Sequence, residues 1–394
     1  MIQLLHTPEG VRDSYGAEQA AKAEILGRIR RLFSLYGYQA IQPPTYEYFD
    51  IFNAERGTIP SREMYKFFDH EGETLVLRPD FTPSIARCAA KYFMHEEYPI
   101  RLCYDGNTFI NSSSLQGRLK ESTQAGVEFI GDNSPASDAE VLALTVDCLL
   151  ASGFKDFLVE VGQVDFFKGL VDEAGLDDDV RQRLCGLIES KNYFGVDELL
   201  FDMQLPDGLK DAFLKLPDLF GDPNDILRSA RDIARNQTMS AAVDRLELIY
   251  DRMKDYGKEK YISFDLGMLS SRMYYTGIIF QAYRYGTGDS IVAGGRYDNL
   301  IGQFGKDAPS VGFGINVDIL MAALMRQRLN VDVPVQDAVI VYDIGAETEA
   351  IKKAEELRGK GKSVSLIPYK DTEKHVEKYA QEHGIPEIIY VGRS

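Results

Sequence analysis

Hydrophobic residues along the chain repeat at two different spacings, which predicts a protein of mixed helices and strands. Residues Ala17–Leu35 carry apolar side chains at helical spacing, with Ile25, Ile29 and Phe33 on one face. Short apolar runs bounded by polar or turn residues predict strands instead. Such runs occur at Tyr38–Ile41, Thr74–Leu77, Arg101–Tyr104, Gly126–Ile130 and Phe157–Val161.

Two further helices are expected from their capping residues. Pro83–Tyr92 follows Thr82, a residue that caps helix N-termini well, and proline is favoured at the first helical position. Ser137–Ser152 begins with a serine that Glu140 follows three residues later, the pattern of a capping box.

The character of the chain changes between about Asp165 and Lys258. Charged, helix-forming segments such as Asp177–Glu189 and Met239–Asp255 dominate there, which indicates a helical insertion. Strands are expected again afterwards, followed by a glycine-rich turn and a helix at about Val317–Arg328. Those strands are Ile262–Leu266, Gly277–Tyr283 and Ser290–Ala293.

The last 60 residues, after a linker at Pro334, alternate between the two patterns. Such alternation is typical of a small α/β domain. We expect strands at Ala338–Tyr342, Ser363–Pro368 and Glu387–Val391, with helices at Glu347–Lys360 and Thr372–His383. The chain thus divides into a core in two parts (1–165 and 261–330), the insertion (166–260) and a C-terminal domain (335–394).

Composition narrows the class of protein. The 394 residues carry a formal net charge of −17, and nucleic-acid binding favours a basic surface, so the charge argues mildly against a tRNA ligand. No run of about 18 apolar residues could span a bilayer, and the N-terminus lacks the features of a secretory signal, so we expect a cytoplasmic protein with no membrane contact. Four cysteines and five histidines show no metal-ligand spacing, which predicts reduced thiols and no metal site.

Five segments in order carry motifs of one enzyme family. A single one is weak evidence, but together they resemble histidyl-tRNA synthetase from about Thr7 to Leu324. The resemblance implies an α+β fold, the class II aminoacyl-tRNA synthetase-like antiparallel sheet flanked by helices. The segments are Thr7–Asp13 (TPEGVRD), Gly37–Glu47 (GYQAIQPPTYE), Leu77–Arg87 (LRPDFTPSIAR), Gln116–Gly131 (QGRLKESTQAGVEFIG), and Tyr274–Gly277 (YYTG) with Gly294–Asp298 (GGRYD).

The resemblance implies a site for histidine. A cationic amine needs a carboxylate and further oxygens at fixed geometry, and an imidazole N–H needs an acceptor. Taken one at a time, these positions could equally be a buried structural acceptor and core aromatic residues; as a set they favour binding of histidine or a close analogue. The matching positions are Asp80, Thr82, Gln124, Glu128, Tyr274 and Tyr275, with Asp80 where the family usually has glutamate.

The nucleotide side departs from the family pattern. Where the family places arginines on ATP, this sequence has Ile110, Ser270 and Ile319. Losing a single preorganised donor typically slows a reaction by about 10²–10³-fold. The alternative is a small misalignment, in which Arg272 covers a ligand carboxylate from the position two residues beyond Ser270.

The remaining glycines and arginines of the motifs have more than one interpretation. Gly294, Gly295 and Arg296 could cradle a phosphate, line the histidine pocket or simply form a tight turn. Arg78 and Arg87 are expected to be structural rather than catalytic.

An amino-acid site without a nucleotide site resembles the regulatory subunits of ATP phosphoribosyltransferase. The resemblance implies a non-catalytic chain without a cofactor, a homodimer through the synthetase-like core. Its implied partner is the short-form catalytic subunit in a hetero-octamer, with L-histidine as feedback effector in the first step of histidine biosynthesis and no tRNA. The alternatives are a histidyl-tRNA synthetase and a free-standing synthetase paralogue.

Overall fold

The computed structural model describes most of the chain as two compact units. It describes residues 5–392 except 53–58, 113–118, 202, 204, 206–207, 270–274, 284–289 and 370–372, and only the backbone of 373–374. The first unit comprises Met1–Ser14 and Ile25–Asn330, and the second Tyr15–Glu24 and Val331–Ser394. The candidate site lies in the first unit.

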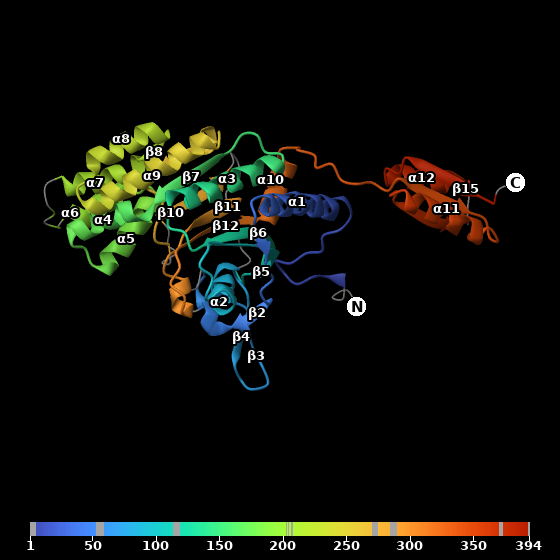
Figure 1. Cartoon of the computed structure of the whole chain (residues 1–394), viewed down its shortest axis with the longest axis horizontal. Coiled ribbons are helices and arrows are strands. Elements are labelled where there is room, and N and C mark those ends of the chain that lie inside the picture. The colour runs from blue at the N-terminus through green and yellow to red at the C-terminus, as the bar shows by residue number, and fades with distance from the viewer. Residues whose placement is uncertain are drawn as a thin grey trace. The chain divides into compact units, whose positions relative to one another are not determined.

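A nine-stranded sheet forms the centre of the first unit, in the order β1-β5-β6-β12-β11-β10-β7-β9-β8 (Figure 1). The six strands from β5 to β7 pair antiparallel, whereas the β1/β5 and β7/β9 pairs are parallel. The predicted antiparallel sheet is therefore confirmed. The strands are β1 Gln39–Ala40, β5 Ile100–Phe109, β6 Glu121–Ile130, β7 Leu158–Gln163, β8 Phe220–Gly221, β9 Ile262–Asp265, β10 Ile278–Tyr283, β11 Val292–Arg296 and β12 Ser310–Asn316.

Helices α1 (Gly16–Leu35), α3 (Pro135–Ala151) and α10 (Val317–Arg326) lie along one side of this sheet (Figure 1). Ile25, Ile29 and Phe33 of α1 are buried, as their helical spacing predicts. On the other side lie α2 (Thr82–Tyr92) and a small antiparallel sheet of β2 (Tyr46–Tyr48), β4 (Thr74–Leu77) and β3 (Lys66–Phe68).

Both predicted helix caps are wrong by a few residues. The residue at the N-cap of α2 is Phe81, so Thr82 is already helical and its hydroxyl is free to bond elsewhere. Helix α3 is capped by Ser134, whose hydroxyl accepts the backbone N–H of Ser137, and Pro135 occupies the first turn. Glu140, the expected partner in a capping box, instead pairs with Arg101 on β5.

The helical insertion leaves the sheet at β7 and returns at β9. Its helices gather at the β7–β9 end of the sheet (Figure 1), and β8, which lies within the insertion, forms the sheet edge. Helix α5 is capped by Asp177, whose side chain accepts the backbone N–H of Val180. The helices are α4 Val164–Ala174, α5 Asp178–Glu189, α6 Tyr193–Phe201, α7 Leu209–Lys215, α8 Pro223–Ile233 and α9 Gln237–Asp255.

The region around Gly294 and Gly295 is not the predicted turn. Both glycines lie inside β11, and the next strand, β12, was not predicted from the sequence. A Cβ on Gly294 would lie 2.4 Å from the Phe280 ring, and a Cβ on Gly295 would lie 2.7 Å from the ring of Tyr275. Glycine is needed here for close approach of neighbouring side chains rather than for a turn.

The C-terminal part of the second unit is a three-stranded parallel sheet with two helices. Strand β13 lies between β14 and β15 and pairs parallel with both, as expected for alternating strands and helices. The elements are β13 Ala338–Tyr342, α11 Glu347–Gly359, β14 Val364–Pro368, α12 Glu373–Glu382 and β15 Glu387–Val391.

Candidate functional site

Strand alternation places Gln124 and Glu128 of β6 on the face of the sheet opposite to α3 and α10. On neighbouring strand β12, Gly312 pairs with Glu128, and Gly314 pairs with Gly126, two residues from Gln124. A Cβ on Gly312 would lie 1.9 Å from Glu128 Oε2, and one on Gly314 would lie 2.0 Å from Gln124 Nε2. The two polar side chains therefore lie across β12 in space that only glycine leaves open.

The start of α2 supplies the second wall of the site. Thr82 Oγ1 donates a 2.8 Å hydrogen bond to Glu128 Oε1. The hydroxyl of Tyr297, which follows β11, donates to the other oxygen of Glu128. Asp80 accepts the backbone N–H of Phe81 at 2.7 Å and is itself buried, with 7% of its surface exposed.

Burial changes the acid–base chemistry of Glu128. Only 1% of this residue is exposed, and burial raises the pKa of Glu128 to about 8 despite the hydrogen bonds from Tyr297 and Thr82. The negative charge of nearby Asp80 raises the pKa of Glu128 further. Near pH 7 the empty site therefore holds Glu128 mostly as the neutral acid, and an arriving cation or N–H donor favours the carboxylate.

These side chains line one small pocket. The structure brings together five of the six predicted residues, and the sixth, Tyr274, lies outside the described residues. Sequence reasoning missed Tyr297 and the two β12 glycines; the position of Tyr297 directly after the GGR motif was the available signal. The lining is Asp80, Thr82, Gln124, Glu128, Tyr275, Ala293, Gly294, Tyr297, Gly312, Phe313 and Gly314.

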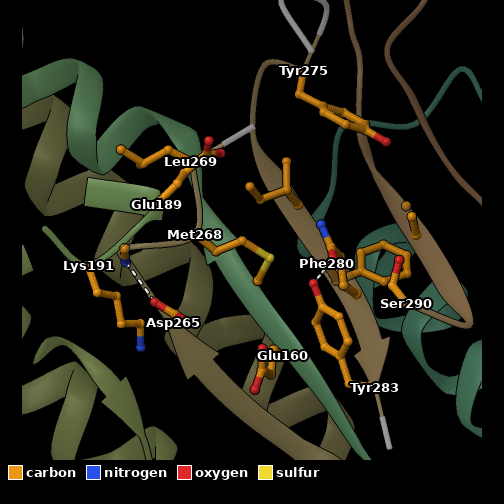
Figure 2. A pocket seen from close by; sticks show the side chains of 15 residues that line it. Glu160, Glu189, Lys191, Asp265, Met268, Leu269, Tyr275, Phe280, Tyr283 and Ser290 are labelled. Carbon is orange, nitrogen blue, oxygen red and sulfur yellow. Dashed lines mark hydrogen bonds between the residues drawn. The ribbon is translucent and has the colours of Figure 1, made fainter. Parts of the chain in front are cut away.

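A larger cavity of about 360 Å³ adjoins the first and shares Tyr275, Ala293 and Gly294 with it. Figure 2 shows its acidic side chains, Glu160 and Asp265 among them, below Tyr275. Burial raises the pKa of both carboxyl groups. Among the described residues that line the two cavities, Lys191 is the single cation.

The arrangement of charge suits a small cationic or amphoteric ligand. The carboxyl groups of Asp80 and Glu128, the hydroxyl of Thr82 and the amide of Gln124 all line the small pocket. Together they offer mainly hydrogen-bond acceptors, which suit a ligand with N–H groups. A triphosphate carries several negative charges and needs cations or oriented N–H groups around it. The described lining offers it little positive charge.

Ile110 and Ile319, two of the three positions where the family has arginine, form hydrogen bonds through their backbone N–H groups. The N–H of Ile110 donates to the carbonyl of Lys120 at 2.8 Å, and the N–H of Ile319 donates to Asn316 Oδ1 at 3.0 Å in the cap of α10. Ser270 and Arg272 lie outside the described residues, so the suggested cover of a ligand carboxylate by Arg272 stays a prediction.

The motif arginines that the structure describes are structural. Arg78 donates to the carbonyls of Asn107 and Pro43 at 2.8 and 3.0 Å. Arg87 pairs with Glu47 at 2.6 Å. Arg296 is 1% exposed and binds protein groups, so it cradles no phosphate, in contrast to one of the three interpretations of the GGR motif.

The described residues contain no cluster of three or more histidine, cysteine or acidic side chains placed to hold a metal ion. Cys88, Cys103, Cys148 and Cys185 are free thiols. Within the same described ranges, none of the helices combines the length and the apolar composition that a bilayer crossing requires.

Comparison with known proteins places this chain in one family. A family model described as Histidyl-tRNA synthetase matches residues 10–320. An ATP phosphoribosyltransferase regulatory subunit from Acetivibrio thermocellus is 39% identical over 98% of this chain and 92% of its own length. A protein of the same name from Thermoanaerobacter pseudethanolicus is 38% identical over 98% of this chain and 99% of its own. The chain belongs to the histidyl-tRNA synthetase-like family of ATP phosphoribosyltransferase regulatory subunits.

Solved structures agree with this membership. A Bacillus halodurans protein described as an ATP phosphoribosyltransferase regulatory subunit/histidyl-tRNA synthetase superposes with a TM-score of 0.89 at 30% identity, covering 99% of both chains. Histidyl-tRNA synthetase from Nostoc has a TM-score of 0.82 at 20% identity over 97% of this chain and 90% of its own, which shows a shared fold. The predicted class II synthetase-like fold is confirmed. The family name further implies a catalytic partner.

Proposed function

We propose that this chain is the non-catalytic regulatory subunit that binds L-histidine and transmits feedback inhibition to a short-form ATP phosphoribosyltransferase catalytic subunit, at the first step of histidine biosynthesis. The observation that supports this proposal most strongly is the polar pocket around Glu128. Five of the positions expected to bind histidine line it, and no cation stands among its described lining residues.

The chemistry of the cavity supports an amino-acid ligand. Asp80 offers a carboxylate to an α-ammonium group, with Thr82 and Gln124 as neighbouring polar groups. Glu128, held by Thr82 and Tyr297, offers an acceptor to an imidazole N–H. Burial makes each of these contacts stronger than the same contact in water.

Feedback inhibition requires that histidine bind one state of the assembly better than another. We propose a cytoplasmic hetero-octamer in which this chain forms homodimers through its synthetase-like core and contacts the catalytic subunits, with no role for tRNA. The missing arginines at Ile110, Ser270 and Ile319 support a chain that does not activate ATP itself.

The deciding experiment measures phosphoribosyl transfer to ATP by a cognate short-form catalytic subunit, with and without this chain, across a histidine titration. Activity that rises on adding the chain and falls with histidine supports the proposal. Separate elution of the two proteins with no change in activity would contradict it. Histidine-dependent ATP–pyrophosphate exchange by the chain alone would favour the alternatives, a histidyl-tRNA synthetase or a free-standing paralogue.

A further inference from the structure

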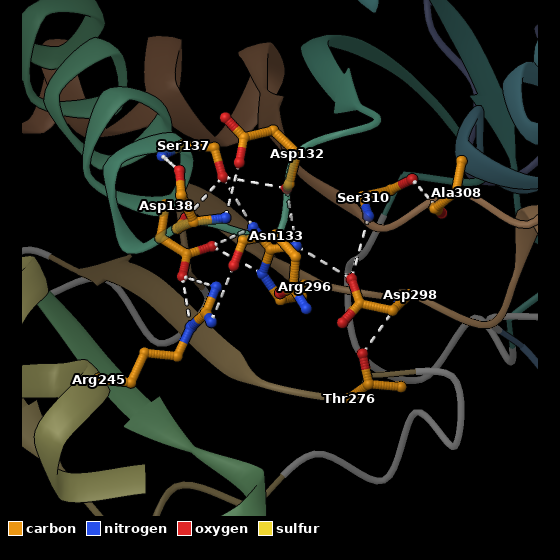
Figure 3. Close-up of polar contacts among 11 residues, drawn as sticks. Asp132, Asn133, Ser137, Asp138, Arg245, Thr276, Arg296, Asp298, Ala308 and Ser310 are labelled. Atoms are coloured by element: carbon orange, nitrogen blue, oxygen red, sulfur yellow. Dashed lines mark hydrogen bonds and ion pairs between the residues drawn. The ribbon is translucent and has the colours of Figure 1, made fainter. Parts of the chain in front are cut away.

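A buried ion-pair bridge joins the helical insertion to the strand end that lines the ligand cavity (Figure 3). At its centre is Asp138, a fully buried residue in the first turn of α3. Arg245 of α9 in the insertion binds Asp138 Oδ2 through Nε at 2.8 Å and Nη2 at 2.6 Å. Arg296 at the end of β11 binds Asp138 Oδ1 through Nε at 2.8 Å and Nη2 at 2.7 Å.

Each guanidinium is tied further into the core. Arg296 also donates to Ser137 Oγ at 2.9 Å, to the carbonyl of Asp132 at 3.1 Å and to Asp298 Oδ1 at 3.0 Å. Arg245 donates to the carbonyl of Asn133 at 3.1 Å. Hydrogen bonds between an arginine and a carboxylate are short and strong, and a buried network of this kind has few alternative arrangements.

The bridge ends one residue from the ligand cavity. Tyr297 follows Arg296 directly, and its hydroxyl donates to Glu128. The backbone of this segment is held on both sides: the N–H of Tyr297 donates to the carbonyl of Ser310 at 2.7 Å, and the N–H of Thr276 to the carbonyl of Arg296 at 2.8 Å.

We propose that Arg245 is a positioning residue: through Asp138 and Arg296 it holds Tyr297 against Glu128 and so sets the affinity of the cavity for its ligand. This proposal rests on the proposed function for the identity of that ligand, L-histidine. It makes the helical insertion part of the recognition machinery, although the described lining of the ligand cavity includes no residue of the insertion.

The role has a signature that general loss of stability would not produce. Tyr297 and Thr82 stabilise the ionised form of Glu128, whereas burial and the charge of Asp80 oppose it. Tyr38 also interacts electrostatically with Glu128: burial raises the pKa of Tyr38, and the charge of Glu128 raises it further. If Tyr297 moves away, the pKa of Glu128 rises, and the carboxylate that holds the ligand forms only at higher pH.

The test uses the full-length chain and L-histidine titrations followed by calorimetry between pH 6 and 9. Arg245→Gln is expected to weaken binding by about three- to thirtyfold, the range of remote couplings, and to move the pH profile of affinity upward. Arg252→Gln on the same helix is the matched control, because Arg252 forms an exposed ion pair with Asp255. It should bind histidine as the wild type does.

A folded Arg245→Gln protein with wild-type affinity and an unchanged pH profile would overturn the proposal. Should that variant not fold, Arg245→Lys decides in its place: it keeps the charge but cannot bond Asp138 and the Asn133 carbonyl together as the guanidinium does. Unchanged affinity and an unchanged pH profile would overturn the proposal equally. Amide hydrogen exchange at Tyr297 and Asp298 tests the bridge without ligand; it should accelerate in the Arg245 variant and not in the control. A wild-type chain that binds no histidine defeats the proposed function, while the exchange result still decides the bridge.

Discussion

Replacing Glu128 by glutamine should stabilise the ligand-free protein, by an amount that grows with pH. The pKa of Glu128 is raised from 4.5 to about 8 in the folded protein, mainly by burial. A raised pKa means that the folded state holds the proton more tightly than the unfolded chain does. The stability that the protonated group contributes is complete below pH 4.5 and is lost as pH rises toward 8.

The magnitude follows from the same values. Each pH unit between 4.5 and about 8 costs the folded protein about 1.4 kcal/mol relative to the unfolded chain, so about 3 kcal/mol is lost by pH 7. Glutamine has nearly the shape of the neutral acid and does not titrate. Glu128→Gln should therefore gain little at pH 4.5, about 3 kcal/mol at pH 7 and about 5 kcal/mol above pH 8.

The assay compares thermal or guanidinium unfolding of wild type and variant at pH 5 and pH 8. The control is Glu140→Gln, which removes one partner of the 2.8 Å ion pair with Arg101 and should gain no stability as pH rises. An equal difference between Glu128→Gln and wild type at both pH values would refute the reasoning, as would a loss that grows with pH. In histidine titrations the stabilised variant should bind weakly, because an amide cannot balance a cationic ligand.

Three further substitutions probe the same site. Gly312→Ala would place a methyl group 1.9 Å from Oε2 of Glu128, so this variant should show no detectable histidine binding in calorimetry. Its control is Gly27→Ala in α1, where a Cβ would have nothing within 4 Å. The control should bind histidine normally and gain about 0.5–1 kcal/mol in unfolding experiments. Tyr297→Phe removes a buried hydrogen bond to a charged group and should raise the histidine Kd by about tenfold or more, with the pH profile of binding moved upward. Arg296→Met leaves its buried carboxylate partner with one guanidinium and should cost about 3–5 kcal/mol in denaturant unfolding, while normal stability would contradict the bridge.

Local patterns predicted the elements well where one face of each is buried. The strands Thr74–Leu77, Ala338–Tyr342 and Glu387–Val391 have the predicted bounds, because short apolar runs between polar residues fix both type and length. The caps failed because several small polar residues precede each helix, and tertiary contacts decide among them. Thr82 is the example: its hydroxyl bonds a glutamate 46 residues away instead of capping its helix.

The polar side chains of the candidate site could be predicted from the sequence, whereas the glycines beside them and the ion-pair bridge could not. Acidic and hydroxyl side chains can be recognised as candidate ligand contacts because they lie within sequence motifs. Gly312 and Gly314 contribute by having no side chain beside β6, which depends on a strand pairing that the local pattern did not reveal. In the Arg245–Asp138–Arg296 bridge, each arginine lies more than 100 positions from the aspartate in the sequence. No local spacing therefore indicates the bridge.

The way in which the insertion is threaded through the sheet bears on how this protein can fold and be engineered. The chain leaves at β7 and re-enters at its parallel neighbour β9, and parallel neighbours always need a long crossover between them. The insertion also contributes β8, which covers the outer edge of β9. Cutting the insertion out would leave an unprotected strand edge, the kind of surface on which chains aggregate. The insertion is therefore not a detachable module, and a minimal version of the synthetase-like core would have to keep it.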